Sequence, residues 1–210
     1  PALLFPVAPE EEELVTYEEG KQGVWASFHY SEEYKNGKAS GAETNSSIEI
    51  DHQELDTTIE KSGNLSATAK ATIIAKANGV RVVPLDLYRT LRVQAVKGGD
   101  GQPLAFIQED KNDDADFGVI LSKALSAGEK VVLTISYAGK DAVLNTGSGN
   151  YFPIARENWY PSGVDAAFGH YATYDLTFRI PKGMKMAATG KMVSEMNDGD
   201  HYVSVWKSDG

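Results

Sequence analysis

Hydrophobic and polar residues alternate along most of the chain beyond residue 47, which is the pattern of strands that bury one face. In the clearest example, Tyr174, Leu176, Phe178 and Ile180 are expected to face the core. Turn signals separate the strands, and no long segment has a 3.6-residue period. We therefore expect an all-β fold, either an antiparallel β-sandwich or a saddle-shaped open sheet, with little helix. The expected strands are Ser47–Ile59, Leu65–Lys76, Val80–Pro84, Tyr88–Val96, Leu104–Gln108, Phe117–Leu121, Lys130–Tyr137, Tyr174–Ile180 and His201–Trp206.

Three local features refine this prediction. The sequence Ser62-Gly63-Asn64 is typical of a turn and joins the first two strands into a long hairpin. One helical turn is predicted over Leu121–Leu125. A Pro-Lys-Gly turn at residues 181–183 is followed by a second short expected strand that runs into Thr189-Gly190.

Residues 1–46 differ from the rest and are expected to form an extension or linker. Pro1–Pro9 is apolar and rich in proline, and Glu10–Glu13 is an acidic run that suits a solvated loop or helix start. Lys35–Ser47 has the composition of a linker. Only Val24–Tyr34 is aromatic enough to predict a strand there. Residues 47–210 are then the β domain.

Composition and charge exclude several classes of function. A hydrophobic content of 41% is enough for a packed core. The net charge of -10 and the absence of a basic stripe argue against nucleic acid as a partner. With no cysteine, the chain has no disulfide and no thiolate metal site. Because the sequence starts at Pro1 without an initiator Met, we expect a processed or cut chain, and a periplasmic, secreted or membrane-anchored location over a cytoplasmic one.

Two acidic clusters could suggest metal sites. Asp110, Asn112 and Asp114 fall at the first, third and fifth positions of an EF-hand loop, but Ala115 and Leu121 stand where that loop needs Gly and Glu. The favoured interpretation is a solvated hairpin loop. In the segment 51–56, one histidine and three acids would need a ligand from another strand to hold a metal, so a polar outer face of the sheet is favoured.

The aromatic corner Trp159-Tyr160-Pro161 is the best candidate for an interface. Large aromatic side chains beside an arginine are typical of binding hot spots, whereas the alternative is that they hold a corner of the sheet as core residues. The last expected strand ends four residues before the carboxyl end, so a neighbouring domain is expected to cover an apolar face or edge nearby. The candidate interface residues are Arg156, Trp159, Tyr160 and Trp206.

Several short motifs occur in an order that resembles the amino-terminal, saddle-like β domain of the aminopeptidase N family of gluzincin zinc metallopeptidases. Most specific are the Trp159-Tyr160-Pro161 corner and the following strand, Pro-Lys-Gly turn and Ala-Thr-Gly motif. Weaker motifs extend the match over roughly residues 48–206, and they are Gly63–Ala67, Leu91 with Val93 and Val96, Gly101–Phe106, and Leu125 to Gly139.

The resemblance implies that the chemistry lies outside this chain. The zinc motif of the family, His-Glu-x-x-His, requires two histidines four residues apart, and the histidines here stand at 29, 52, 170 and 201. The chain alone is therefore expected to be inactive and to hold no cofactor. Zinc, with a glutamate as base and a water that attacks a peptide substrate, is expected in the catalytic domain of the same polypeptide.

Two departures from the family pattern indicate a divergent bacterial-type branch. The stretch Gly147–Phe152 has no Gln-x-Glu pair of the kind that holds a substrate's amine in many members. Ser162-Gly163-Val164-Asp165 stands where many relatives have Cys-x-Asp-x-Pro. A second hypothesis stays open, which is a β-sandwich module for adhesion or for binding protein or carbohydrate, with no peptidase attached.

Overall fold

The structure is a computed structural model that describes residues 2–8, 11–18, 21–28, 31–35, 47–108, 110–112, 116–153, 158–163 and 172–208. The chain divides into two compact units, Pro1–Asn45 and Ser46–Gly210. Each unit has its own sheets. Among the described residues, no helix is long and apolar enough to cross a membrane.

The first unit contains more strand than its composition indicates. An antiparallel sheet has the order β1-β2-β3, and a five-residue helix follows it. The strand predicted over Val24–Tyr34 is confirmed for residues 24–28, whereas residues 31–35 are helical, and the acidic run contributes to a strand instead of a loop. Pairing with neighbouring strands supports these elements, and single-sequence composition does not show such pairing. The elements are β1 (Ala2–Ala8), β2 (Glu11–Glu18), β3 (Lys21–Phe28) and α1 (Ser31–Lys35).

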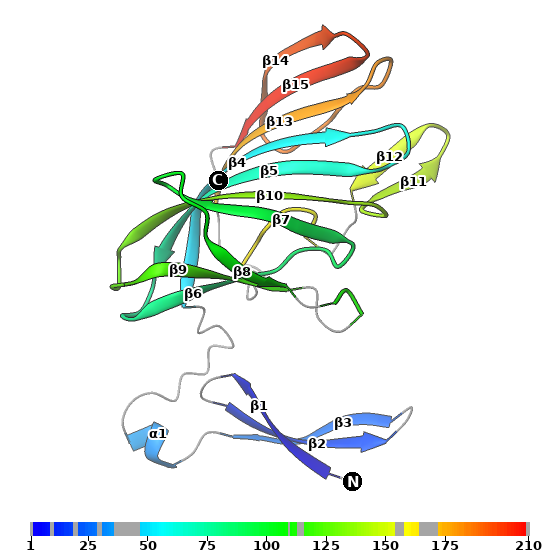
Figure 1. The fold of residues 1–210 in the computed structure, drawn as a ribbon. Coiled ribbons are helices and arrows are strands. Elements are labelled where there is room, and N and C mark those ends of the chain that lie inside the picture. Colours follow the sequence, from blue (N-terminus) through cyan, green and yellow to red (C-terminus); the bar gives the residue numbers. More distant parts are fainter. Residues whose placement is uncertain are drawn as a thin grey trace. The chain divides into compact units, whose positions relative to one another are not determined.

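A seven-stranded sheet dominates the second unit (Figure 1), in the order β14-β15-β13-β4-β5-β10-β7. Its neighbours are antiparallel except β13 and β4, which are parallel. The all-β prediction is confirmed, and the main sheet is mixed. Its strands are β4 (Ile48–Ile59), β5 (Leu65–Ala75), β7 (Leu91–Gly98), β10 (Lys130–Gly139), β13 (Thr173–Pro181), β14 (Lys191–Asp198) and β15 (His201–Ser208).

Two smaller sheets complete this unit. The first has the order β6-β9-β8 and lies below β7 and β10 in Figure 1. The second is a hairpin that sequence reasoning missed. The predicted helical turn over Leu121–Leu125 is wrong, because β9 continues to Leu125, which is buried and pairs with Val80. The strands are β6 (Val80–Leu85), β8 (Ala105–Gln108), β9 (Phe117–Leu125), β11 (Val143–Gly147) and β12 (Asn150–Pro153).

Strand β13 has the register that the alternation predicts. Leu176, Phe178 and Ile180 are buried, and Tyr174 is half-buried and packs against the same core. Burial of a large apolar side chain is worth about 1.5–3 kcal/mol, so this face anchors β13 in the sheet. The second short strand predicted to run into Thr189-Gly190 is wrong, because residues 184–188 are irregular and β14 begins only at Lys191.

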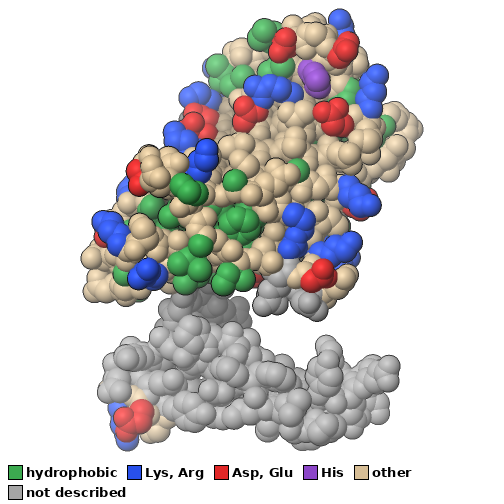
Figure 2. Space-filling view, viewed as in Figure 1, with side chains coloured by type: hydrophobic (Ala, Val, Ile, Leu, Met, Phe, Trp, Pro, Cys, Tyr) green, Lys and Arg blue, Asp and Glu red, His purple; other side chains and the backbone are tan. Residues whose placement is uncertain are grey.

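The opposite face of the large sheet is polar. Acids of β4 pair with cations of β5, β10 and β13. Lys70 Nζ lies 2.7 Å from Glu54 Oε1, Lys130 Nζ lies 2.7 Å from Asp51 Oδ2, and Arg179 donates to Asp56. Figure 2 shows positive and negative side chains interspersed over this sheet. Exposed pairs contribute only about 0–1 kcal/mol each, but they leave these acids engaged with protein cations.

Candidate functional site

The aromatic corner is fixed to the segment that follows β6. The backbone of Asp86 and Ser162 exchanges two hydrogen bonds of 2.8 and 3.0 Å, and Tyr88 N donates to Asn158 O at 2.7 Å. The side-chain amide of Asn158 also donates to the Asp86 carboxylate. Residues 158–162 are therefore held by a short antiparallel ladder, although no regular strand forms there.

A buried side chain ties the corner to the large sheet as well. The amide nitrogen of Gln53, on β4, donates to Pro161 O at 2.9 Å. Gln53 is almost fully buried, and its side-chain carbonyl oxygen has no hydrogen-bond partner among the described residues. The hydroxyl groups of Thr57, Tyr137 and Ser162 are also buried without a described partner. These groups are candidates for solvation by internal water.

Aromatic rings link the corner to β13. The Trp159 ring lies 5.0 Å from Tyr160 in an edge-on arrangement and 5.8 Å from Phe178, and Tyr160 lies 5.7 Å from Tyr174. Such pairs add about 0.5–1.5 kcal/mol beyond area burial. Burial, followed by the hydrogen bond with Tyr160, raises the pKa of the Tyr174 hydroxyl, so this phenol is neutral at physiological pH.

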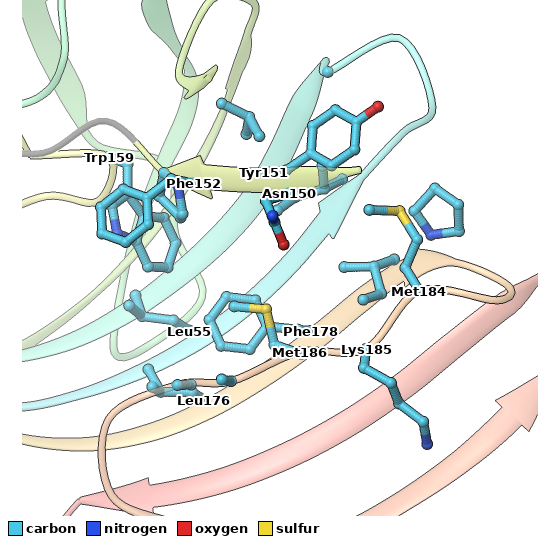
Figure 3. Close-up of a pocket in the computed structure, with 18 of the residues that line it drawn as sticks. Leu55, Asn150, Tyr151, Phe152, Trp159, Leu176, Phe178, Met184, Lys185 and Met186 are labelled. Atoms are coloured by element: carbon cyan, nitrogen blue, oxygen red, sulfur yellow. The ribbon is translucent and has the colours of Figure 1, made fainter. Parts of the chain in front are cut away.

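The corner borders an open trough of about 1440 Å³ on the inner face of the large sheet. Figure 3 shows its floor, made by Leu55, Leu176 and Phe178. Trp159 stands on one side together with the hairpin strand β12, and the segment after β13 stands on the other. The floor side chains are buried, whereas both walls carry apolar groups that water reaches.

The walls contribute the most exposed apolar groups of the trough. Phe152 is 56% exposed and Tyr151 is 44% exposed, both on β12. Met184 and Met186 line the other wall and are half-buried. A contiguous surface of aromatic and methionine side chains is typical of binding surfaces.

An ion-paired cluster fixes the second wall to the sheet. Lys185, which lines the trough, donates to Glu195 on β14 at 3.0 Å, and its ammonium lies 4.4 Å from the Tyr202 ring centroid. The Tyr202 hydroxyl also donates to Glu195. Hydrogen bonds from Tyr202 and Lys185 hold the pKa of Glu195 below its ordinary value, and the hydrogen bond to Glu195 raises the pKa of Lys185.

The candidate interface residues from the sequence occupy different places. Trp159 and Tyr160 pack against the core, and both also line the trough. Trp206, on β15, pairs with Leu176 and Met192 and is half-buried, but it is not among the described residues that line the trough. Arg156 lies outside the described residues. The interface role of all four remains a prediction.

The described residues do not suit a zinc site. They contain no group of three His, Cys, Asp or Glu side chains placed to hold a metal ion. His52 Nδ1 lies 2.7 Å from Thr173 Oγ1, its neighbour on β13. In the acidic segment 110–116, for which the sequence favours a solvated hairpin loop over a calcium site, Asp110 accepts hydrogen bonds from Asn112, and Asp114 lies outside the described residues.

Sequence reasoning found Trp159 but missed the wall residues of the β11–β12 hairpin and of the segment after β13. The signal for the hairpin was present in the turn sequence Asn145-Thr-Gly-Ser-Gly-Asn150, with apolar pairs on either side. Positive φ angles at Gly147, Ser148 and Gly149 show why the turn requires these residue types. The sequence predicted a strand over Met184 and Met186. Because these residues are in an irregular segment instead, their position beside the trough was not predicted.

Comparison with solved structures defines the fold. A mutant M1 zinc metallopeptidase from Deinococcus radiodurans bound to a Tyr-Ser-Ala substrate matches with a TM-score of 0.64 at 19% identity, over 77% of this chain and 39% of that chain. A two-domain M1 zinc metallopeptidase mutant bound to L-tryptophan matches with a TM-score of 0.63 at 18% identity, over 79% of this chain and 40% of that chain. No protein-family model and no curated protein sequence matches this chain.

The chain therefore has the fold of one part of an M1 zinc metallopeptidase, which confirms at the level of fold the resemblance found in the motifs. It spans about two fifths of the length of the structures that it matches. That coverage is consistent with the amino-terminal domain that the order of motifs indicates.

Proposed function

We propose that this chain is the non-catalytic amino-terminal domain of an aminopeptidase N-like zinc metallopeptidase. The shared fold carries the proposal, because most of this chain corresponds to a minor part of a zinc peptidase. The order of the motifs around Trp159 adds to it. The zinc of the parent protein is proposed to lie in another domain, and the part of this chain that the structure describes shows no group placed to hold a metal ion.

In the parent, this domain packs on the zinc domain and limits the access of peptides to the active-site cleft. The architecture suits such a role, because the corner is held from two sides by Gln53 and by the Asp86–Ser162 ladder. A fixed corner can position a wall of a cleft without taking part in the reaction. Peptide amino termini are the expected substrates of the parent.

The coding sequence beyond residue 210 tests this proposal first. We expect a His-Glu-x-x-His motif with a downstream glutamate within the next domain. The polypeptide that contains both domains should then be purified and its zinc measured by elemental mass spectrometry, with the 210-residue chain as the control. About one zinc per polypeptide in the first and none in the second is the expected result. A reading frame with no zinc motif would instead favour a binding module.

A further inference from the structure

We propose that the outer face of the β6-β9-β8 sheet is a contact surface for a second copy of this chain. Two copies meet face to face about a two-fold axis that lies in the plane of contact, at right angles to the strands. None of the described residues that line the trough belongs to β6, β8 or β9, so this surface and the trough are separate.

The outer face of this sheet is apolar although water reaches it. Val82 is 50% exposed and Ile107 is 62% exposed, whereas Val83 and Val119 of the same sheet are buried in the core. Figure 2 shows hydrophobic side chains gathered over this sheet. A sheet face toward water is normally polar, so an apolar one is typical of a contact surface. The strand register arranges the face in two rows, Val82, Ile120 and Ala105 in the first and Pro84, Gly118 and Ile107 in the second.

The shape of the face is complementary to itself. Strand β8 presents one large and one small residue, Ile107 and Ala105, and β9 presents Ile120 and Gly118. The place beside Gly118 is tight, because a Cβ there would stand 3.2 Å from Val82 Cγ1. The two-fold rotation exchanges the two rows, so Ile107 of one copy lies over Ala105 of the other. Ile120 likewise lies over Gly118, and large groups meet small ones, as close packing requires.

The end of the face where β6 begins and β9 ends is basic. Arg81 and Lys123 are exposed there, and Lys123 Nζ pairs with Glu129 at 2.8 Å. Arg81 Nε donates to Leu121 O at 3.1 Å, which holds this side chain beside the sheet. In the part of the chain that the structure describes, Arg81 makes no ion pair with a carboxylate. Its charge is therefore available to a partner.

The opposite end, where β8 ends and β9 begins, is acidic. Asp110 is exposed and Asp116 is half-buried, with Lys111 as a cation beside them. The rotation that exchanges the two rows also places this end of one copy over Arg81 of the other. Opposite charges at the rim of a contact fix its orientation. Because a net charge of -10 opposes random association, a second copy requires a local complementarity of this kind.

The size of the face predicts a weak dimer. Three strands about 4.8 Å apart, each with two same-face positions about 6.6 Å apart, give an apolar area of roughly 200 Å². A stable contact buries about 800 Å² on each partner, so the charged ends have to contribute and the dimer is expected to be half-formed only at roughly 100 µM.

Sedimentation velocity of the 210-residue chain tests the contact, with concentrations from about 10 to about 500 µM to cover the range of weak association. Ile107→Lys should weaken the dimer at least about tenfold, because it buries an unpaired charge. Met196→Lys is the control, since Met196 is also 62% exposed but lies on β14, and it should leave association unchanged. Circular dichroism establishes that both variants keep the fold.

Three results of this series would overturn the proposal. A chain that stays monomeric up to the highest concentration would leave the face to another occupant, such as a different domain of a longer polypeptide. Equal association of Ile107→Lys and the unmodified chain would place any dimer contact elsewhere. Weakening by Met196→Lys as large as that by Ile107→Lys would assign the contact to the edge strand β14 or to a general charge effect.

An exchange of charges tests the orientation of the two copies. Arg81→Glu and Asp110→Lys should each weaken the dimer, because ends of like charge then meet. An equimolar mixture of the two variants should associate as well as the unmodified chain, since both ends are acidic in one variant and basic in the other. Sedimentation of one variant with a fluorophore on its amino terminus measures the mixed dimer. A mixture that associates no better than either variant alone would overturn the two-fold arrangement.

Discussion

The side-chain amide of Gln53 donates a 2.9 Å hydrogen bond to the carbonyl oxygen of Pro161, so the central strand of the sheet is tied to the aromatic corner over 108 residues of sequence. Gln53 is buried, and its own carbonyl oxygen has no protein partner. The corner is therefore held by a donor from the sheet floor in addition to its backbone ladder with Asp86.

Replacing this donor should loosen the corner. Gln53→Met keeps the volume but leaves the Pro161 carbonyl oxygen unpaired, and we expect a loss of about 1–3 kcal/mol in the free energy of unfolding. Gln94→Met, on the exposed side of β7, is the control and should change stability by less than about 0.5 kcal/mol. Denaturant unfolding followed by tryptophan fluorescence measures both. If Gln53→Met lowers the free energy of unfolding as little as Gln94→Met does, the hydrogen bond from Gln53 to Pro161 contributes little to stability.

The register of β13 makes a second prediction. Leu176→Asp buries an unpaired carboxylate and should destabilise the chain by about 3 kcal/mol or more. Thr177→Asn, on the outer face, should change stability by less than about 1 kcal/mol. An amide is the better control at 177 because an aspartate would stand opposite Asp56 on β4. Equal melting temperatures for Leu176→Asp and Thr177→Asn would contradict this register.

Two structural constraints favour glycine at position 190. Its φ is +90°, and a Cβ there would stand 2.1 Å from the carbonyl oxygen of Lys207 on β15. Gly190→Ala should therefore lower stability by about 2–4 kcal/mol through backbone strain and a clash between neighbouring strands. At Gly163 a Cβ meets no atom of the described residues within 4 Å, and φ is not in the left-handed region. Gly163→Ala should accordingly be almost neutral, and a similar fall in melting temperature for both would contradict the prediction.

The cluster of Lys185, Glu195 and Tyr202 should make the second trough wall sensitive to pH. The pKa of Glu195 lies below its ordinary value of 4.5, so its contribution to stability is present above that value and is lost as the pH falls through the lowered pKa. The pKa of Lys185 lies above its ordinary value of 10.5, so its contribution is present below that value and is lost as the pH rises through the raised pKa.

Glu195→Gln tests this pH dependence. At about pH 7 the variant should melt below the unmodified chain, and the difference should shrink as the pH falls through the lowered pKa of Glu195, because the protonated carboxyl group carries no charge. Hydrogen exchange of residues 184–189 gives a local readout, and it should be faster in the variant at about pH 7. A melting difference that is unchanged across this range would show that the carboxylate charge is not its cause.

The alternation of residues 174–180 allowed the strand, its register and its buried face to be predicted before the structure. The same pattern could not show that β13 lies parallel to β4, because the partners Thr173 and His52 are 121 residues apart in sequence. Which strands become neighbours depends on packing of the whole inner face, and a local pattern carries little information about it.

The candidate site was predicted only in part. The corner could be found because Trp159 and Tyr160 are unusual large residues beside a proline. The trough beside them also depends on Phe152 and Met184, which come from a hairpin and from an irregular segment without alternation. The irregular segment gains its position from tertiary contacts such as that between Lys185 and Glu195, which a local pattern does not show.

Turnover of amino-acid anilides, measured side by side for the 210-residue chain and for the longer polypeptide that contains it, tests the central claim most directly. With added zinc, the longer polypeptide should show saturable hydrolysis that a chelator abolishes and zinc restores. The chain alone should show none, because its histidines at 29, 52, 170 and 201 provide no pair one helical turn apart. Chelator-sensitive, saturable hydrolysis by the purified chain itself would contradict the account.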